Sequence, residues 1–330
     1  MIIHCHHSVF SVILIRVCYD MDNNDFERWI NMRISKDNVI YSMDKENQAV
    51  GTVKSGAQVI FETKDCFSDT IKTESDVISE IDFNKVNPAT GPLYIEGAQP
   101  GDVLKVTINA IKLNDYGVAV SAPGLNKLFT KGIEEEQTVI CPIHEDKGTF
   151  EFQSVEFPLN KMIGVIGTAN ADEGITTGTP GPHGGNMDNT MIAEGSVVYL
   201  PVYTEGALLA IGDMHASMGD GEVWGCGVEA GGEAHVTVEV MKDYPHSVPL
   251  VETAEAFYTY GYGETTNKAI VMANDHMVEF LMKEAGLTFN QAGMLMTIKA
   301  DLAACQTVNP DASMRVGIQK EFVELAKNFK

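Results

Sequence analysis

Residues 212–222 carry the densest set of potential metal ligands and acid/base groups in the chain. The segment reads Gly-Asp-Met-His-Ala-Ser-Met-Gly-Asp-Gly-Glu and directly follows a strongly apolar run. Asp213 and His215 are two residues apart, so at the end of an extended strand they project to the same side, which suits chelation of one cation. Asp220 and Glu222 repeat this spacing. The alternative is that these Asp and Gly residues only build turns and that Glu222 is solvated.

A loop rich in glycine and proline, residues 178–189, is the second candidate. It reads Gly-Thr-Pro-Gly-Pro-His-Gly-Gly-Asn-Met-Asp-Asn, in which His183 and Asp188 are the possible ligands or acid/base groups. As an alternative, Asn186 and Asp188 merely supply left-handed turn geometry and His183 lies on the surface. A phosphate-binding loop is disfavoured because no Lys-Ser/Thr pair follows the glycines.

The third candidate is the run Glu-Thr-Lys-Asp-Cys-Phe at residues 62–67, at the end of an early predicted strand. Cys66 can act as a nucleophile only if a neighbouring base lowers its pKa, and a buried, inert thiol is the favoured interpretation. Asp65 is the more attractive ligand, although isolated carboxylates at strand ends usually cap turns.

Most of the elements that must position these groups are predicted strands. Residues 104–108 alternate between apolar and polar types, which is typical of a half-buried strand, and residues 236–240 do the same, with His235 expected on the surface. Residues 197–203 and 207–211 are continuously apolar, which favours burial on both faces.

The pattern changes after about residue 264. Apolar residues recur at helical spacing from Ala269 to Leu281, with Gly286 as a stop signal, and Thr288 with Gln291 forms a capping-box pattern that opens a second helix through roughly Asp301. His276 lies on the apolar stripe and is expected to be a hydrogen-bonded core histidine rather than a ligand.

These patterns predict a mainly β fold, sandwich-like or barrel-like, with a small α+β portion near the C-terminus. Residues 1–31 are expected to be an N-terminal extension outside the fold, with translation expected to start at Met32. Residues 32–160 form an N-terminal β region, and residues 263–330 form the α-containing portion. Between them, residues 161–262 are a glycine-rich β region that carries the site. Within it, residues 161–232 hold 16 of the 30 glycines, and functional sites tend to lie in such loops.

The overall charge narrows the classes of partner. The chain has 46 acidic and 23 basic residues among 330, a formal charge of −23, and lacks any Lys/Arg run. Nucleic acids and anionic membrane surfaces are therefore disfavoured as partners, because both are recognised through clustered cations. The six cysteines contain no CxxC pair, which favours free thiols in a cytoplasmic protein over a disulfide framework.

Taken in order, four runs resemble the acetamidase/formamidase family, and the resemblance extends over residues 32–330. These runs are residues 62–67, 91–104, 184–188 and 212–222. The resemblance implies a mostly β fold, hydrolysis of short-chain amides to carboxylate and ammonia, and often a metal ion and a dimer. One departure is Met218, where a polar residue such as Gln is expected, and it bears on substrate choice and on the polarity of the site.

An unactivated amide needs a nucleophile at neutral pH, stabilisation of the tetrahedral oxyanion and protonation of the leaving nitrogen, and a bound divalent metal can supply the first two. In this hypothesis Glu222 moves the proton, Asp220 orients it, and peptide N–H groups of the loop donate to the oxyanion. The candidate catalytic residues are Glu222, Asp220 and His183; the candidate substrate-binding residues are Gly184, Gly185 and Asn186; the candidate metal ligands are Asp65, Asp188, Asp213 and His215.

The sequence leaves the metal and the substrate open. Carboxylate-rich sites favour hard ions such as calcium or manganese, whereas His215 keeps zinc possible, and zinc or calcium is the expected cofactor. The expected partners are a small amide substrate and, from the resemblance, a second copy in a homodimer. Two alternatives remain: a thiol-dependent amidase using Cys66 or Cys226, and a non-catalytic β-rich small-molecule or metal-binding protein.

Overall fold

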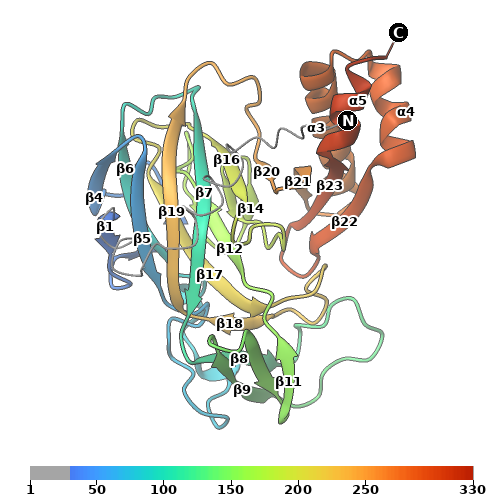
Figure 1. Cartoon of the computed structure of the whole chain (residues 1–330). Helices are drawn as coiled ribbons and strands as arrows, with labels where there is room; N and C mark the ends of the chain where they lie inside the picture. Colours follow the sequence, from blue (N-terminus) through green and yellow to red (C-terminus); the bar gives the residue numbers. More distant parts are fainter. Residues whose placement is uncertain (1–29, 330) are drawn as a thin grey trace, which may run out of the picture.

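The computed structural model describes residues 30–329, and two large sheets contain most of its strands (Figure 1). The first sheet has nine strands. In spatial order they are β1 (Ile30–Ile34), β5 (Ala57–Thr63), β19 (Gly232–Met241), β7 (Val103–Leu113), β16 (Val197–Pro201), β20 (Leu250–Glu252), β21 (Ala256–Gly263), β23 (Ala312–Gln319) and β22 (Asp301–Gln306).

The second sheet has twelve strands, nine of them along one path. The path is β11 (Val155–Pro158), β10 (Thr149–Phe152), β9 (Gln137–His144), β8 (Tyr116–Ser121), β18 (Val228–Ala230), β17 (Leu209–Ser217), β12 (Met162–Gly167), β15 (Gly184–Asn186) and β14 (Pro180–Gly181). Strand β6 (Ala89–Glu96) branches from β17 and pairs with β2 (Val39–Ile40) and β4 (Gly51–Lys54). Strands β3 (Ser42–Met43) and β13 (Ile175–Thr176) form a separate pair, and two 3-10 turns span Ile78–Glu80 and Phe83–Lys85.

One hydrophobic core lies between the two sheets. It joins Phe61 and Ile108 of the first sheet to Leu93, Ile163 and Ile211 of the second, and all five are fully buried. The alternating strands contribute one face to this core, whereas β17, which begins within the continuously apolar run 207–211, is buried along nearly its whole length, including Asp213 and His215. The expected mainly β, sandwich-like fold is therefore confirmed. Strands from residues 32–160 and 161–262 interleave in both sheets.

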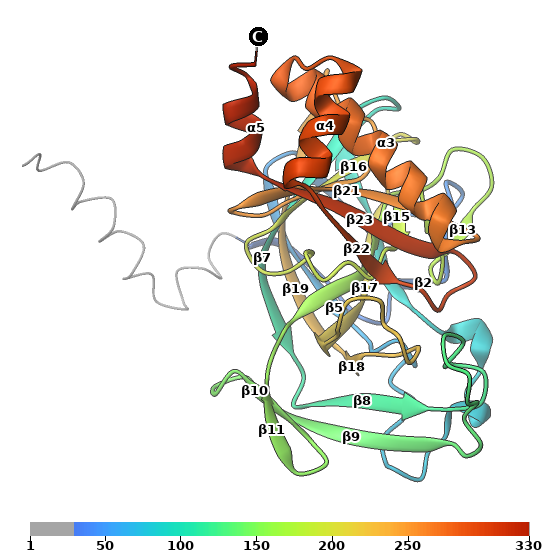
Figure 2. The same cartoon turned by 90° about the vertical axis from the view of Figure 1, so that its right-hand side faces the viewer.

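The C-terminal portion places three helices over β21, β23 and β22 (Figure 2). Helix α3 (Thr266–Ala285) ends at Gly286, which takes a left-handed φ of 67°. Helix α4 (Phe289–Lys299) opens with the expected capping box between Thr288 and Gln291, and α5 is Lys320–Ala326. His276 is satisfied, as expected, by a 2.7 Å contact from Nδ1 to the Tyr260 carbonyl oxygen.

The structure differs from the sequence-based expectation at His235 and at the start of β1. His235 was expected on the surface but is only 3% exposed, because β19 lies between β5 and β7 and the Glu233 carboxylate approaches His235 Nε2 at 2.7 Å. Strand β1 begins at Ile30, and the predicted N-terminal extension otherwise lies outside the described residues. Within residues 30–329, no helix has both the length and the apolar character required to span a membrane.

Candidate functional site

Four carboxyl groups and one imidazole meet beside the middle of the second sheet. Asp213 and His215 lie on β17, Glu229 on β18, Glu222 in the loop between these strands, and Asp188 just after β15. Donor atoms of Asp188, Asp213 and His215 all lie within 4.8 Å of one another, and so do those of His215, Glu222 and Glu229. His215 Nε2 is 3.0 Å from Glu229 Oε2 and 3.5 Å from Asp213 Oδ1. The histidine is thus shared by both groups.

Three of these acids have backbone conformations that are uncommon for residues with a side chain. The φ angles are 44° at Asp188, 54° at Asp213 and 47° at Glu222. Such conformations persist only where the surrounding structure enforces them, and they concentrate at functional sites. The left-handed backbone turns each carboxyl toward the cluster.

Gly164 on β12 makes room for two of the carboxyl groups. Its carbonyl oxygen accepts hydrogen bonds from the N–H groups of Met187 and Asp188, at 3.1 and 3.2 Å. A methyl group at Gly164 would overlap Asp188 Oδ1 and lie 2.8 Å from Asp213 Oδ2. A glycine is therefore required at this position by close approach rather than by backbone angle.

Burial makes full ionisation of this cluster costly. Burial raises the pKa of Glu222 to about 8, although the charge of His215 opposes this shift. Burial and the negative charge of Glu229 raise the pKa of Asp213 to about 6. Burial and the neighbouring acids raise the pKa of Asp188 well above its ordinary value. Among residues 30–329 no Lys or Arg forms an ion pair with any of these carboxyls or with Glu229. Positive charge must come from protons, from His215 or from a bound cation.

The imidazole and Glu229 behave as a charged pair. Burial opposes the charge on His215, but Glu229 and Asp213 outweigh it and hold the pKa of His215 well above its ordinary value. Burial likewise opposes the charge on Glu229, yet His215 lowers the pKa of this carboxyl to about 2. Nδ1 of His215 and Oδ1 of Asp188 are buried and find no hydrogen-bond partner among the described residues. The unpartnered Asp188 oxygen in this anionic cluster fits a bound divalent cation, and the imidazole of His215 can join in binding it once it has lost its proton.

Two thiols lie beside the cluster. Cys226 Sγ is 3.2 Å from Glu229 Oε1, and Cys66 Sγ lies within 4.8 Å of donor atoms of Asp213 and Glu229. Burial raises the pKa of Cys66 well above its ordinary value. A contact with Cys66 lowers the pKa of Cys226, but burial and the charge of Glu229 raise it overall, to about 12. Both side chains are therefore neutral thiols at neutral pH, which weakens their candidacy as nucleophiles.

The loop that carries Glu222 is fastened to the C-terminal strands. Arg315 of β23 donates two hydrogen bonds to Asp220, at 3.0 and 2.6 Å, and Thr190 donates a third at 2.8 Å. Partial burial opposes the charge on Asp220, but these hydrogen bonds hold its pKa below the ordinary value. The Gly221 N–H donates to the Cys305 carbonyl at 2.9 Å. Asp220 thus fixes the loop through Arg315, rather than orienting Glu222 directly as predicted.

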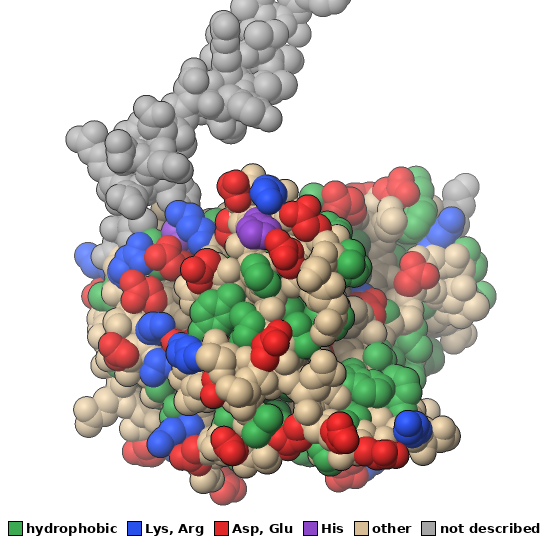
Figure 3. All heavy atoms as spheres, turned by 90° about the horizontal axis from the view of Figure 1, so that it is seen from below, with side chains coloured by type: hydrophobic (Ala, Val, Ile, Leu, Met, Phe, Trp, Pro, Cys, Tyr) green, Lys and Arg blue, Asp and Glu red, His purple; other side chains and the backbone are tan. Residues whose placement is uncertain are grey.

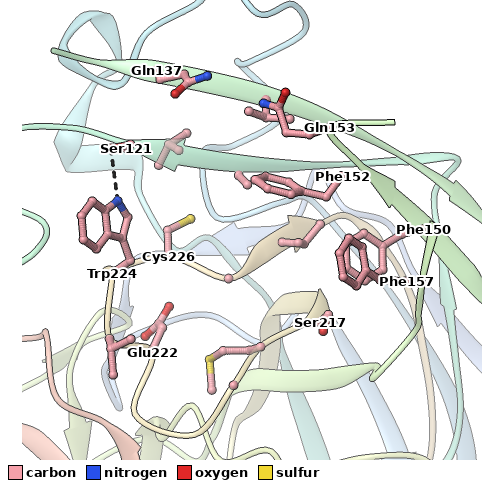
Figure 4. A pocket seen from close by; sticks show the side chains of 18 of the residues that line it. Ser121, Gln137, Phe150, Phe152, Gln153, Phe157, Ser217, Glu222, Trp224 and Cys226 are labelled. Carbon is pink, nitrogen blue, oxygen red and sulfur yellow. Dashed lines mark hydrogen bonds between the residues drawn. The ribbon is translucent and has the colours of Figure 1, made fainter. Parts of the chain in front are cut away.

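A cavity of about 610 Å³ opens beside this loop (Figure 4). Glu222 and Cys226 line it on the side of the cluster, and Phe150, Phe152 and Phe157 lie across from them. Seen from below, the surface carries patches of hydrophobic side chains among many acidic ones (Figure 3). The cavity gives a small molecule access to Glu222, which belongs to the cluster.

The structure does not bring Asp65 and His183 into the cluster. Asp65 Oδ1 accepts hydrogen bonds from the N–H groups of Phe67 and Asp69, at 3.0 and 2.8 Å, so this carboxyl caps a turn. Burial raises its pKa to about 7. His183 is buried beside Gly167, three residues along β12 from Gly164, and burial lowers its pKa to about 4.

The predicted substrate-binding residues form a buried strand. Gly184, Gly185 and Asn186 make up β15, which pairs with β12 and β14, and none of the three is among the described residues that line the cavity. The Asn186 N–H donates to the Thr179 carbonyl at 3.2 Å. The strand formed by these three residues leads directly into the segment that carries Asp188.

The sequence places Glu229 at the end of the polar segment that begins at Gly212, but it gives this residue no role. A usable indication was present, because Glu229 stands between Val228 and Ala230 in a short strand whose three residues are all buried. A carboxylate in such a place needs a partner. The structure supplies that partner in His215.

Solved structures with the same overall fold come from acetamidases. An acetamidase structure from Bacillus halodurans is 45% identical, with a TM-score of 0.86, and the match covers 89% of this chain and 99% of that one. A predicted acetamidase/formamidase from Thermoanaerobacter tengcongensis is 40% identical, also with a TM-score of 0.86, and the match covers 91% and 99%.

Curated relatives match over shorter lengths. A formamidase from Methylophilus methylotrophus is 26% identical over 221 residues, which is 50% of this chain and 54% of that protein, so this chain spans about half the length of that relative. Residues 41–173 and 162–316 match the Acetamidase/Formamidase family. With most of its length matched in this way, the chain belongs to the acetamidase/formamidase family.

Proposed function

We propose that this protein hydrolyses primary amides with the help of a bound divalent cation. Water adds to the carbonyl carbon, the C–N bond breaks, and the products are a carboxylate and ammonium. The observation that carries the proposal is the convergence of four carboxyl groups on one imidazole, with Glu222 reaching both this cluster and the cavity. Family membership supports the same chemistry.

In this proposal Asp188, Asp213 and His215, whose donor atoms all lie within 4.8 Å of one another, hold the cation, and Glu229 supports this set through its contact of 3.0 Å with His215 Nε2. Asp65 is not part of this set, because its Oδ1 is already engaged by two backbone N–H groups. When bound, a divalent cation polarises a carbonyl group and lowers the pKa of water toward about 7. The imidazole favours zinc over calcium, because calcium takes oxygen ligands.

Glu222 is suited to carry the proton. Its pKa of about 8 lies near neutrality, so the carboxyl exchanges protons readily at the pH of the reaction. Its carboxylate accepts a proton from the attacking water, and the resulting carboxylic acid donates that proton to the departing nitrogen. A bound cation would lower this pKa, because a nearby positive charge favours the ionised carboxylate. Asp220 and Arg315 hold the loop and thereby fix the position of Glu222.

The test combines metal analysis with ammonia release. We expect purified protein to contain about one equivalent of metal, to release ammonia from short amides, and to lose activity on chelation and regain it when zinc is added back. The variant His215→Ala should lose both metal and activity, whereas Glu222→Gln should keep metal and lose activity at least about 100-fold.

Two matched variants control for the loss of a side chain of the same type. His246→Ala and Glu264→Gln alter residues that pair with Glu284 and Lys268 and belong to none of the groups of described residues that could hold a metal, so both should keep metal and activity. Full turnover in either site variant would remove that residue from the proposed mechanism. Stoichiometric metal without turnover of any amide would favour the non-catalytic metal-binding alternative.

Assembly and location belong to the same proposal. We infer a homodimer in the cytoplasm, in line with the family resemblance and with free thiols at Cys66, Cys141, Cys226 and Cys305. Light scattering should give about twice the chain mass of 35.9 kDa. A mass equal to one chain would refute the dimer.

A further inference from the structure

The cavity beside Glu222 has a strongly aromatic wall. Phe152 and Phe157 come from the hairpin of β10 and β11, where the rings of Phe150 and Phe157 stack with centroids 5.8 Å apart. Trp224 is held by a 3.1 Å hydrogen bond from Nε1 to the Ser121 hydroxyl oxygen (Figure 4). The rings of Phe157 and Trp224 are therefore held in place by contacts within the protein.

The aromatic wall is exposed to water in the free protein. Phe152 and Trp224 are each 39% exposed and Phe157 is 43% exposed. Apolar surface exposed to water beside a reactive group gains free energy when a ligand covers it. A ligand with an apolar group could therefore gain binding energy at this wall while its polar end reaches Glu222.

The cavity is much larger than the smallest amides. Its volume of about 610 Å³ falls within the range of about 300–1,000 Å³ typical of pockets for drug-sized ligands. Acetamide has four non-hydrogen atoms, so at about 30 Å³ for each water-sized atom it would fill about 120 Å³. An acetamide molecule at Glu222 would leave the aromatic wall uncovered.

The charges around the cavity narrow the choice of acyl group. The described residues that line it include Asp220 and Glu222 but no Lys or Arg. A substrate with an anionic acyl group would find no counter-charge there, and Glu222 would repel it when ionised. A cationic group would find Asp220 already paired with Arg315, and only Glu222, where the amide itself must lie, would attract it. The lining therefore favours a neutral, apolar acyl group.

We propose that the substrate is a primary amide whose acyl group carries a neutral aromatic ring, with the amide at Glu222 and the ring against Phe152 and Phe157. The inference rests on the proposed amidase function and deepens it by naming the substrate class. Phenylacetamide represents this class, and acetamide represents the alternative of a small amide.

The experiment compares kcat/KM for phenylacetamide and for acetamide. We expect kcat/KM to be about 10 to 100 times higher for phenylacetamide than for acetamide. The reason is that burying one aromatic ring against an apolar wall strengthens binding by about that factor. In Phe152→Ala and Phe157→Ala the ratio should fall at least about threefold, through a higher KM for phenylacetamide, while kcat/KM for acetamide stays within twofold. Phe289→Ala, which removes an exposed ring on α4, should leave the ratio unchanged.

Binding provides a second measurement that does not depend on turnover. Isothermal titration calorimetry of phenylacetamide with the Glu222→Gln variant should show saturable binding. Binding should be weaker in the double variant that combines Glu222→Gln with Phe152→Ala. A ratio near or below one in the native protein, or a ratio that both cavity variants leave unchanged, would overturn the inference while leaving amide hydrolysis intact. Absence of turnover of every amide would instead refute the proposed function.

Discussion

Replacement of Gly164 by alanine tests whether the close approach of two carboxyls makes the site. The added methyl group would overlap Asp188 Oδ1 and meet Asp213 Oδ2 at 2.8 Å, whereas ordinary contact begins near 3.4 Å. Both carboxyls must therefore move outward, Asp213 by at least about half an ångström and Asp188 by more. Gly164 does not have the left-handed φ that would itself penalise alanine.

The expected cost falls more on activity than on folding. Overpacking of this kind destabilises a protein by about 1–3 kcal/mol, which lowers the melting temperature by several degrees in a chain of this size. Displacing reacting groups by about 1 Å costs about 100-fold in rate. We therefore expect Gly164→Ala to remain folded, to bind less metal and to lose about 100-fold in kcat/KM.

The assay combines ammonia release, elemental analysis and thermal unfolding on the same preparations. Gly178→Ala is the matched control, because a methyl group there meets nothing within 4 Å and its φ lies outside the left-handed region. The control should behave as the native protein in all three measurements. Native metal content and kcat/KM in Gly164→Ala would refute the view that these two carboxyls act together.

Four further predictions follow from individual contacts. Arg315→Met removes the two hydrogen bonds to Asp220 and should lower kcat about tenfold in the ammonia assay, and Arg315→Lys should not restore it because an ammonium lacks the paired donors. Cys226→Ser should retain activity within about threefold, and a complete loss would revive the thiol-dependent alternative. Asp65→Asn should keep native metal content, since Asn also offers an oxygen to the turn, and loss of metal would return Asp65 to the ligand set. Burial lowers the pKa of His183 from 6.5 to about 4, so the unfolded chain binds a proton that the folded chain does not, and the free energy of unfolding falls as pH drops from about 6.5 toward 4. Between pH 7 and 4.5 this loss of stability amounts to about 2 kcal/mol. Denaturant unfolding of His183→Asn should therefore show a loss of stability that is smaller by about this amount.

Much of the framework follows from local sequence patterns. The alternation of apolar and polar residues at 104–108 correctly predicts strand β7, and the capping box at Thr288 correctly predicts the start of helix α4. Both signals depend only on residues close together in the chain. The spacing of Asp213 and His215 likewise predicted that they lie together on one strand. These parts of the prediction depend on residues that are near one another in the chain.

The remainder of the site depends on contacts distant in sequence. Asp65 and His183 are residue types that often bind metals, but neither belongs to the cluster. The Asp65 carboxylate accepts hydrogen bonds from the backbone of a turn, and the His183 ring is buried beside Gly167. Glu229 joins the site because β18 pairs with β17, a register that no local pattern specifies. The role of Asp220 depends on Arg315, 95 residues away.

The dependence of the Glu222 loop on β22 and β23 has a consequence for biosynthesis. Every acid of the cluster precedes residue 230, so a nascent chain exposes all of them well before the strands that fasten their loop emerge from the ribosome. Until Cys305 and Arg315 dock, the Asp220–Glu222 turn lacks its backbone and guanidinium anchors. The loop that carries Glu222 should therefore take its final position only when synthesis is nearly complete.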